Sequence, residues 1–195
     1  GPYRTEAQAF ARTTLAGSGE SGRVDGVGTL AEFNAPRGVA FSPDATFLAV
    51  SCGERTVPGA TDLGATGLRL VHAASGNVST LAGGQAAGFD DGVGTAATFR
   101  YPGGVAYSPD GAHIAVADQY NHAVRLVRVA TGEVSTLAGT GAAGTVDGAG
   151  ADGVAGDPSS PQPTFKEPVG VAWSPHGVIA VSEYEGHRVR LITLN

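Results

Sequence analysis

The stretch from Tyr101 to Gly139, YPGGVAYSPDGAHIAVADQYNHAVRLVRVATGEVSTLAG, contains one complete structural unit, and most of the remaining sequence repeats it. Its opening motif, Pro102-Gly-Gly-Val-Ala-Tyr-Ser-Pro, recurs as Pro36-Arg-Gly-Val-Ala-Phe-Ser-Pro and as Pro168-Val-Gly-Val-Ala-Trp-Ser-Pro, in steps of 66 residues. A self-similar period of this kind indicates a repeat architecture, in which each unit buries its apolar face against the next one.

The central unit has the pattern of four short strands separated by turn residues. Strands are predicted at 104–107, 113–117, 123–129 and 133–137, and Ser108-Pro-Asp-Gly111 is a typical tight turn. Four short antiparallel strands per unit are typical of a β-propeller blade. The sequence therefore predicts an all-β fold with blade one at about 36–81 and blade two at about 102–137.

A Gly-rich connection precedes each opening motif and contains two fixed positions. An Asp begins each connection and a Phe lies close to its end, at Phe33, Phe99 and Phe165. Gly permits positive φ, and Asp accepts hydrogen bonds from the backbone nearby, so these connections are predicted to be shaped loops. We expect the Phe to fill the space between neighbouring sheets.

The chain begins and ends part-way through a repeat. Ala11-Arg-Thr-Thr-Leu-Ala-Gly17 aligns with the last strands of the other repeats, so residues 11–15 are predicted to be a fourth strand. The third repeat, at about 168–195, has only strands one to three. Residues 1–10 begin with Gly-Pro, the dipeptide that tag-removing proteases leave, and are interpreted as a tag scar and leader.

Two complete blades and one split blade are too few to close a ring, because propellers have four or more blades. We therefore predict that the three blades are half of a six-bladed ring completed by a second chain. Each chain would lend residues 11–15 to the other, giving a strand-exchanged homodimer without open sheet edges. The alternative is that this sequence is half of a longer single-chain propeller.

Composition excludes some classes of partner. The 195 residues carry a formal net charge of −6 without a basic cluster, which argues against nucleic-acid binding. No apolar run is long enough to span a bilayer, so no membrane partner is expected. Cys52 is the single cysteine, so no intrachain disulfide forms. The Asn77-Val-Ser sequon matters only in a secreted protein, and the sequence leaves the compartment open.

The pattern D-G-x-G…F-x-x-P-x-G-V-A-x-S-P-D-G…V-A-D-x-x-N-H-x-V-R-L…T-G-x-V-S-T-L-A-G resembles the NHL-repeat family of propellers. Asn121 and His122 match the segment that names the family. The resemblance covers most of residues 11–195 and is most specific for the central repeat. It implies a platform for protein interactions; some members of the family bind RNA, and related six-bladed enzymes hold a metal at the central axis.

A polar set in the central repeat has the residue types of an active site, but we interpret it as structural. A carboxylate, an amide and a guanidinium also serve to hold a loop and to satisfy buried backbone groups. Versions of the set recur, although the first repeat has Cys52 in place of Asp118 and the third has Glu183 and Gly186. The predicted structural residues are Asp25, Asp91, Asp147, Asp118, Asn121, Arg69, Arg125 and Arg190.

The side chains predicted to meet a ligand or partner lie in the loops after the second strands. Tyr and His suit this role because they present flat apolar area with a polar tip. The alternative is ordinary loop polarity. The residues are Tyr120, His122, Tyr184, Glu185 and His187.

No metal-ligating or catalytic residue is assigned from the sequence, and no cofactor is expected. The five histidines lack the spacing of a metal motif, and a solvated loop is favoured over a calcium site at Asp152 and Asp157. The preferred hypothesis is a non-enzymatic scaffold that binds proteins or peptides. The alternatives are a calcium- or zinc-dependent lyase or hydrolase of the six-bladed type and, third, an RNA-binding domain.

Overall fold

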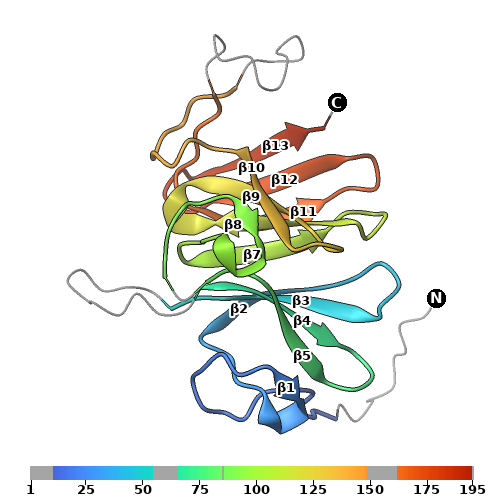
Figure 1. Cartoon of the computed structure of the whole chain (residues 1–195). Helices are drawn as coiled ribbons and strands as arrows, with labels where there is room; N and C mark the ends of the chain where they lie inside the picture. The colour runs from blue at the N-terminus through green and yellow to red at the C-terminus, as the bar shows by residue number, and fades with distance from the viewer. Residues whose placement is uncertain (1–10, 55–65, 85, 149–161, 195) are drawn as a thin grey trace.

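The structure, a computed structural model, describes residues 11–54, 66–84, 86–148 and 162–194. Within these ranges the regular elements are strands and three single-turn 3-10 helices, so the predicted all-β fold is confirmed (Figure 1). None of the helices in these ranges has the length and apolar character needed to cross a membrane. The predicted leader at 1–10 lies outside the described residues, as do most of residues 54–66 and 151–164, where the first and third repeats are longer in sequence than the central one.

The strands form three antiparallel sheets that follow the repeats. The first sheet has the order β1-β5-β4-β3-β2, the second β6-β10-β9-β8-β7, and the third β11-β12-β13. The first contains β1 (Gly26–Val27), β2 (Pro36–Phe41), β3 (Phe47–Cys52), β4 (Gly67–His72) and β5 (Asn77–Ala82). The second contains β6 (Gly92–Val93), β7 (Pro102–Tyr107), β8 (His113–Asp118), β9 (Ala123–Arg128) and β10 (Glu133–Ala138). The third contains β11 (Pro168–Trp173), β12 (Val178–Glu183) and β13 (Arg188–Thr193).

The first two sheets have five strands each where the sequence predicts four-stranded blades. The additional strands, β1 and β6, are two residues long and pair with β5 and β10 at the outer edge of their own sheets. Each continues into a 3-10 helix, η1 (Gly28–Leu30) or η2 (Gly94–Ala96). A two-residue Gly-Val strand inside a Gly-rich loop has too little length for period-2 alternation, so it left no signal in the sequence.

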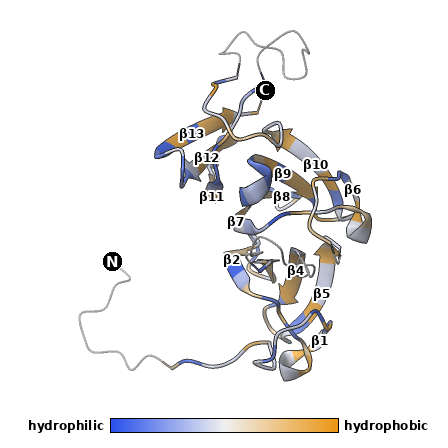
Figure 2. Cartoon of the chain, turned by 90° about the vertical axis from the view of Figure 1, so that its left-hand side faces the viewer, coloured by the Kyte–Doolittle hydropathy of each residue, from blue (hydrophilic) through white to orange (hydrophobic). Residues whose placement is uncertain are grey.

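The three sheets follow one another along an arc (Figure 2). Their first long strands, β2, β7 and β11, lie along one side of the arc, and β2 contacts β7 as β7 contacts β11. The core lies between the sheets. Phe99 is buried among residues of the first and second sheets, and Phe165 among residues of the second and third. The expectation that this Phe fills the space between sheets is therefore confirmed at both described junctions.

The glycine of the opening motif allows the inner strands to approach closely. A Cβ at Gly38 would lie 2.4 Å from the carbonyl oxygen of Gly103, and a Cβ at Gly104 would lie 2.9 Å from the Cα of Gly170. Contacts this short exclude any side chain, so the motif repeats a glycine wherever one inner strand packs on the next.

In the part of the chain described, the N-terminal segment has no strand partner and the last strand is paired along one edge only. Residues 11–15 form no strand and are exposed, and β13 pairs only with β12. Exchange of residues 11–15 between two chains therefore stays a prediction.

Candidate functional site

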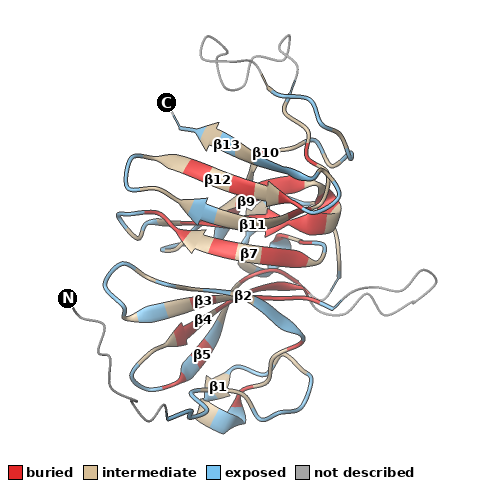
Figure 3. Cartoon of the chain, turned by 180° about the vertical axis from the view of Figure 1, so that it is seen from behind, coloured by how far each residue is buried: buried red, intermediate tan, exposed pale blue. Residues whose placement is uncertain are grey.

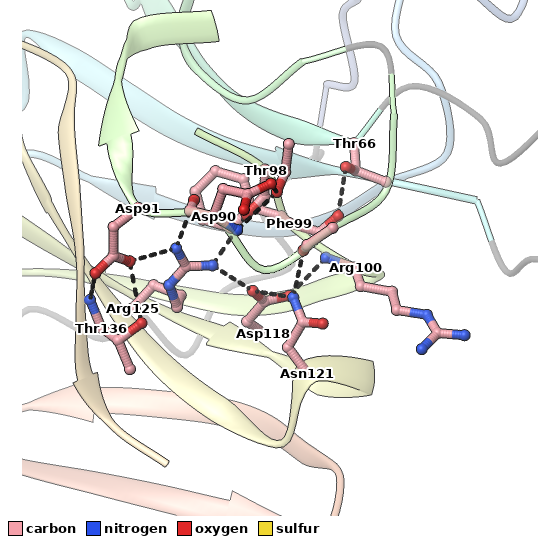
Figure 4. Close-up of polar contacts among 11 residues, drawn as sticks. Thr66, Asp90, Asp91, Thr98, Phe99, Arg100, Asp118, Asn121, Arg125 and Thr136 are labelled. Carbon is pink, nitrogen blue, oxygen red and sulfur yellow. Dashed lines mark hydrogen bonds and ion pairs between the residues drawn. The ribbon is translucent and has the colours of Figure 1, made fainter. Parts of the chain in front are cut away.

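Arg125, on β9, is the centre of a buried polar cluster in the second sheet (Figure 4). Its Nη1 lies 2.9 Å from Oδ2 of Asp118, whose side chain is also fully buried, and its Nη2 lies 2.7 Å from Oδ1 of the half-exposed Asp91. The two carboxylates compensate the charge of a guanidinium that has been removed from water. Burying this cation without such partners would cost a large amount of free energy.

The same guanidinium holds the Gly-rich loop in place. Arg125 donates from Nη1 to the carbonyl oxygen of Thr98 at 2.9 Å and from Nη2 to that of Asp90 at 2.9 Å. Its central carbon also lies 5.3 Å from the ring centroid of Phe99. One side chain thus fixes the loop that places Phe99 between the sheets.

Asp118 completes the anchor from the end of β8. Its Oδ1 accepts a hydrogen bond of 2.8 Å from the backbone N–H of Arg100, and its Oδ2 accepts one of 2.7 Å from Nδ2 of Asn121. Asn121 also donates to the carbonyl oxygen of Gly88 at 2.6 Å. Burial raises the pKa of Asp118 to about 6, against these hydrogen bonds and the charge of Arg125, which favour the carboxylate.

Asp91 joins the loop to the outer strand β10. Its Oδ2 accepts a hydrogen bond of 3.1 Å from the backbone N–H of Thr136, and its Oδ1 accepts one of 3.0 Å from the hydroxyl of Thr136. Partial burial opposes ionisation, but the hydrogen bonds from Arg125 and Thr136 outweigh it and lower the pKa of Asp91. The carboxylate is therefore charged and hydrogen-bonded at neutral pH.

The third sheet builds the same anchor with a longer acid. Arg190 Nη1 lies 3.0 Å from Oε1 of Glu183, and Nη2 pairs with Asp147. Oε2 of Glu183 accepts a hydrogen bond of 2.9 Å from the backbone N–H of Lys166, as Asp118 does in the second sheet. A Cβ at Gly186 would lie 2.2 Å from Oε2 of Glu183, so the glycine makes room for the additional methylene of glutamate.

The first sheet has the arginine without the second acid. Arg69 pairs with Asp25 at 2.6 Å and donates to the carbonyl oxygen of Glu32 at 2.9 Å. Cys52 occupies the position of Asp118, and burial raises the pKa of its thiol to about 11, even though Arg69 and Arg23 lie near. The thiol is therefore neutral and compensates no charge.

The residues predicted to meet a partner lie at the ends of β8 and β12. Tyr120 stacks on Tyr101, with ring centroids 4.8 Å apart. Nδ1 of His122 accepts a hydrogen bond of 3.1 Å from the backbone N–H of Glu167. The pKa of His122 is lowered, chiefly because the ring is partly buried. In the third sheet Tyr184 is 64% exposed. Glu185 and His187 are also exposed, and Glu185 lies 3.7 Å from Lys166.

Sequence reasoning missed a network that joins the three sheets beside these loops. Arg37 stacks over the ring of Tyr101 at 3.6 Å and donates from Nη2 to Oε1 of Gln119 at 3.0 Å. Gln119 in turn donates from Nε2 to Oε2 of Glu167 at 3.0 Å. These positions carry different residues in the three repeats, as Arg37 does against Gly103 and Val169, so no pattern marked them.

The chemistry of the cluster is that of a structural support. Asp118 is occupied by three donors in the protein, and Arg125 by two carboxylates and two carbonyl groups. In the described ranges, no three His, Cys, Asp or Glu side chains gather in a way that would hold a metal ion. Asp152 and Asp157, considered above for calcium, lie outside those ranges.

Comparison with known proteins identifies relatives, one of which is named for its NHL repeats. No family model matches the chain. NHL repeat-containing protein 2 of Gallus gallus is 30% identical over 135 residues, which cover 65% of this chain and 17% of that protein. Protein SUPPRESSOR OF QUENCHING 1, chloroplastic, of Arabidopsis thaliana is 32% identical over 163 residues, which cover 84% of this chain and 14% of that protein. The chain thus spans about a sixth of the length of the first of these curated relatives and about a seventh of the second.

Solved structures support the fold. An auxiliary nutrient binding protein from Bacteroides thetaiotaomicron aligns with a TM-score of 0.59 at 18% identity, over 78% of this chain and 36% of that one. A putative phosphatase from the same organism aligns with a TM-score of 0.56 at 20% identity, over 80% and 34%. These solved structures show the fold, and the similarity to NHL repeat-containing protein 2, together with the repeated sheets, shows that the chain belongs to the NHL-repeat family of β-propeller proteins.

Proposed function

We propose that this chain is a non-enzymatic scaffold that binds a protein or peptide through the loops at the ends of β8 and β12. The observation that carries the proposal is that some polar residues are buried and hold the structure together, whereas others are exposed. Arg125, Asp118 and Glu183 are buried and bonded to the Gly-rich connections, whereas Tyr184, Glu185 and His187 are exposed on the neighbouring connection between β12 and β13. A surface that is ordered before binding loses less entropy when a partner binds.

The network beside the loops supports the same function. Arg37 lies on β2 of the first sheet, Gln119 lies on η3 (Gln119–Asn121) after β8 of the second, and Glu167 directly precedes β11 of the third. Their hydrogen bonds join the edges of three sheets, so the aromatic side chains of Tyr101 and Tyr120 are presented from a rigid support. Rigid Tyr side chains supply contact area at low entropic cost.

We further propose that the scaffold acts as a homodimer in which residues 11–15 of each chain become the outer strand of the other chain's third sheet. Two features support this assembly: β13 has an open edge in the described structure, and residues 11–15 form no strand within their own chain. An open edge strand invites pairing with another strand.

The binding role is tested by selecting peptides from a displayed library on the wild-type protein. Selected peptides should lose binding to the Tyr120→Ala/Tyr184→Ala variant and keep it with Leu30→Ala, which removes an exposed apolar side chain on η1 instead. Isothermal titration measures the affinities, and urea unfolding checks that both variants fold. If no peptide is enriched, or if enriched peptides bind both variants equally, the proposed binding surface is wrong.

A further inference from the structure

The first sheet has an apolar face whose inner part, on β2, is left uncovered by the described chain. Val39 and Phe41, on β2, are 62% and 59% exposed. Their counterparts in the second sheet, Val105 and Tyr107, are only 6% and 9% exposed because they pack on the first sheet. The first pair is therefore exposed because no sheet packs on that side among the described residues, and β2 is open where β7 is largely buried (Figure 3).

The third sheet has the complementary face uncovered. Val189 and Leu191, on β13, are 73% and 70% exposed. Val124, the counterpart of Val189 in the second sheet, is fully buried against the third sheet with Phe165. Leu70, the counterpart of Leu191 in the first sheet, packs in the same cluster as Tyr107 of the second sheet. The exposed face of β13 therefore corresponds to the faces of the first and second sheets on which the following sheet packs.

The inner strands repeat this relation. Gly38 and Gly104 each face the backbone of the following inner strand at less than van der Waals distance. Around the Cβ position of Gly170, by contrast, only Ser182 of the same sheet lies within 4 Å. The third inner strand retains the glycine that makes room for a following strand, without a following strand in the described structure.

The N-terminal segment already lies where an outer strand of a preceding sheet would end. The carbonyl oxygen of Leu15 approaches the Cβ position of Gly76 to 2.4 Å, as that of Leu81, at the end of β5, approaches Gly132 to 2.4 Å. Leu81 belongs to the sheet that precedes the sheet of Gly132. Leu15 therefore has the position, relative to the first sheet, of an outer strand from a sheet before it.

Gly17 gives the matching residue on the other side of the contact. Gly83 and Gly139, with φ of +101° and +104°, lie against Gly67 and Ala123, the first residues of the third long strands. Gly17 has the same conformation, with φ of +110°, but only Phe33 lies within 4 Å of its Cβ position. The first residue of the corresponding strand with an open edge is Arg188, on β13.

We propose that these two faces bind each other between two copies of this chain. Val39 and Phe41 of each copy pack on Val189 and Leu191 of the other, and Gly17 of each copy lies against Arg188 of the other. The contact is head-to-tail, and because the sheets follow an arc, two such contacts close two copies into one ring. The inference rests on the homodimer proposed above and names the surfaces that hold it.

Introducing opposite charges on the two sides of the contact tests the inference. Phe41→Lys and Leu191→Glu each place a charge on an exposed residue, so neither should prevent folding of the single chain. Each variant alone puts a charge against an apolar side chain in both contacts of the ring, and we expect sedimentation at the mass of one chain. An equimolar mixture restores one unmodified contact and makes the other a Lys–Glu pair, so we expect twice that mass. Val93→Asp, an equally exposed apolar site on the middle sheet, is the matched control and should remain dimeric.

The results separate this inference from its premises. A mixture that stays monomeric, or single variants that stay dimeric, would overturn the head-to-tail packing of the two faces. If a variant that begins at residue 16 is monomeric while Phe41→Lys and Leu191→Glu remain dimeric, the exchanged strand holds the dimer and the face contact is wrong. A wild-type chain that is monomeric at micromolar concentration removes the dimer altogether, and leaves the proposed binding role of the loops to its own peptide test.

Discussion

The anchors of the second and third sheets predict a specific rescue between two substitutions. Asp118 with Asn121 in the second sheet corresponds to Glu183 with Gly186 in the third. Asp118→Glu alone should destabilise the protein, since Asn121 occupies the space that the longer acid needs. Adding Asn121→Gly should recover much of the loss, because it rebuilds the combination that the third sheet already contains.

The structure sets the magnitudes. An additional methylene in a fully packed site costs about 1–3 kcal/mol. Asn121→Gly alone removes hydrogen bonds of 2.7 Å to Asp118 and 2.6 Å to Gly88, a loss of about 1–3 kcal/mol. In the third sheet, a Cβ at Gly186 would lie 2.2 Å from Oε2 of Glu183, so the overpacking disappears when the neighbour is glycine. We therefore expect a favourable coupling of about 1–2 kcal/mol between the two substitutions.

Urea unfolding followed by the fluorescence of Trp173, the single tryptophan, measures all four members of this cycle. As a control, Asp118→Glu is combined with Asn77→Gly, an exposed site in another sheet, where the two effects should simply add. A coupling below about 0.5 kcal/mol between Asp118→Glu and Asn121→Gly would refute the reasoning that the two sheets build one anchor in two ways.

Three further outcomes follow from local geometry. Ala45 has φ of +58°, so Ala45→Gly should raise the free energy of unfolding by about 0.5–1 kcal/mol. Gly177 has φ of +80° and nothing within 4 Å of its Cβ position, so Gly177→Ala should lower the free energy of unfolding by a similar amount. Urea unfolding measures both changes. Because burial raises the pKa of Cys52 to about 11, a disulfide reagent at pH 8 should modify the native thiol on the order of 100-fold more slowly than the unfolded one; equal rates would contradict this. The folded-state pKa of His122 is lowered, so its contribution to stability is present above the unfolded value of about 6.5 and is lost as pH falls through the folded value. The unfolding free energy of wild type should therefore fall more steeply below pH 6.5 than that of His122→Asn, and a parallel decline would contradict this.

The fold was predictable because the motif of each main element occurs three times in the sequence. The opening motif and the Phe before it recur at fixed spacing, and packing between sheets explains both. The turn at Ser108 also recurs, and the side-chain hydrogen bonds of Ser108 and Asp110 explain it. The two-residue strands β1 and β6 were not predictable, because their pairing depends on the outer strand and not on their own two side chains.

The site was only partly predictable, for a physical reason. The anchor residues recur in sequence, so their role could be inferred by comparing repeats, down to the substitution of Glu183 and Gly186 for Asp118 and Asn121. The network of Arg37, Gln119 and Glu167 arises from three different sheets and occurs once, so only the packing of the sheets brings it together.

The mass of the wild-type particle in solution tests the central claim most directly, that two uncovered and complementary faces of this chain bind each other. Sedimentation equilibrium at micromolar concentration should give twice the chain mass of 19.4 kDa, without larger species as the concentration rises. A mass of one chain would contradict the claim, and a mass that grows steadily with concentration would mean that the head-to-tail contact forms without closing a ring.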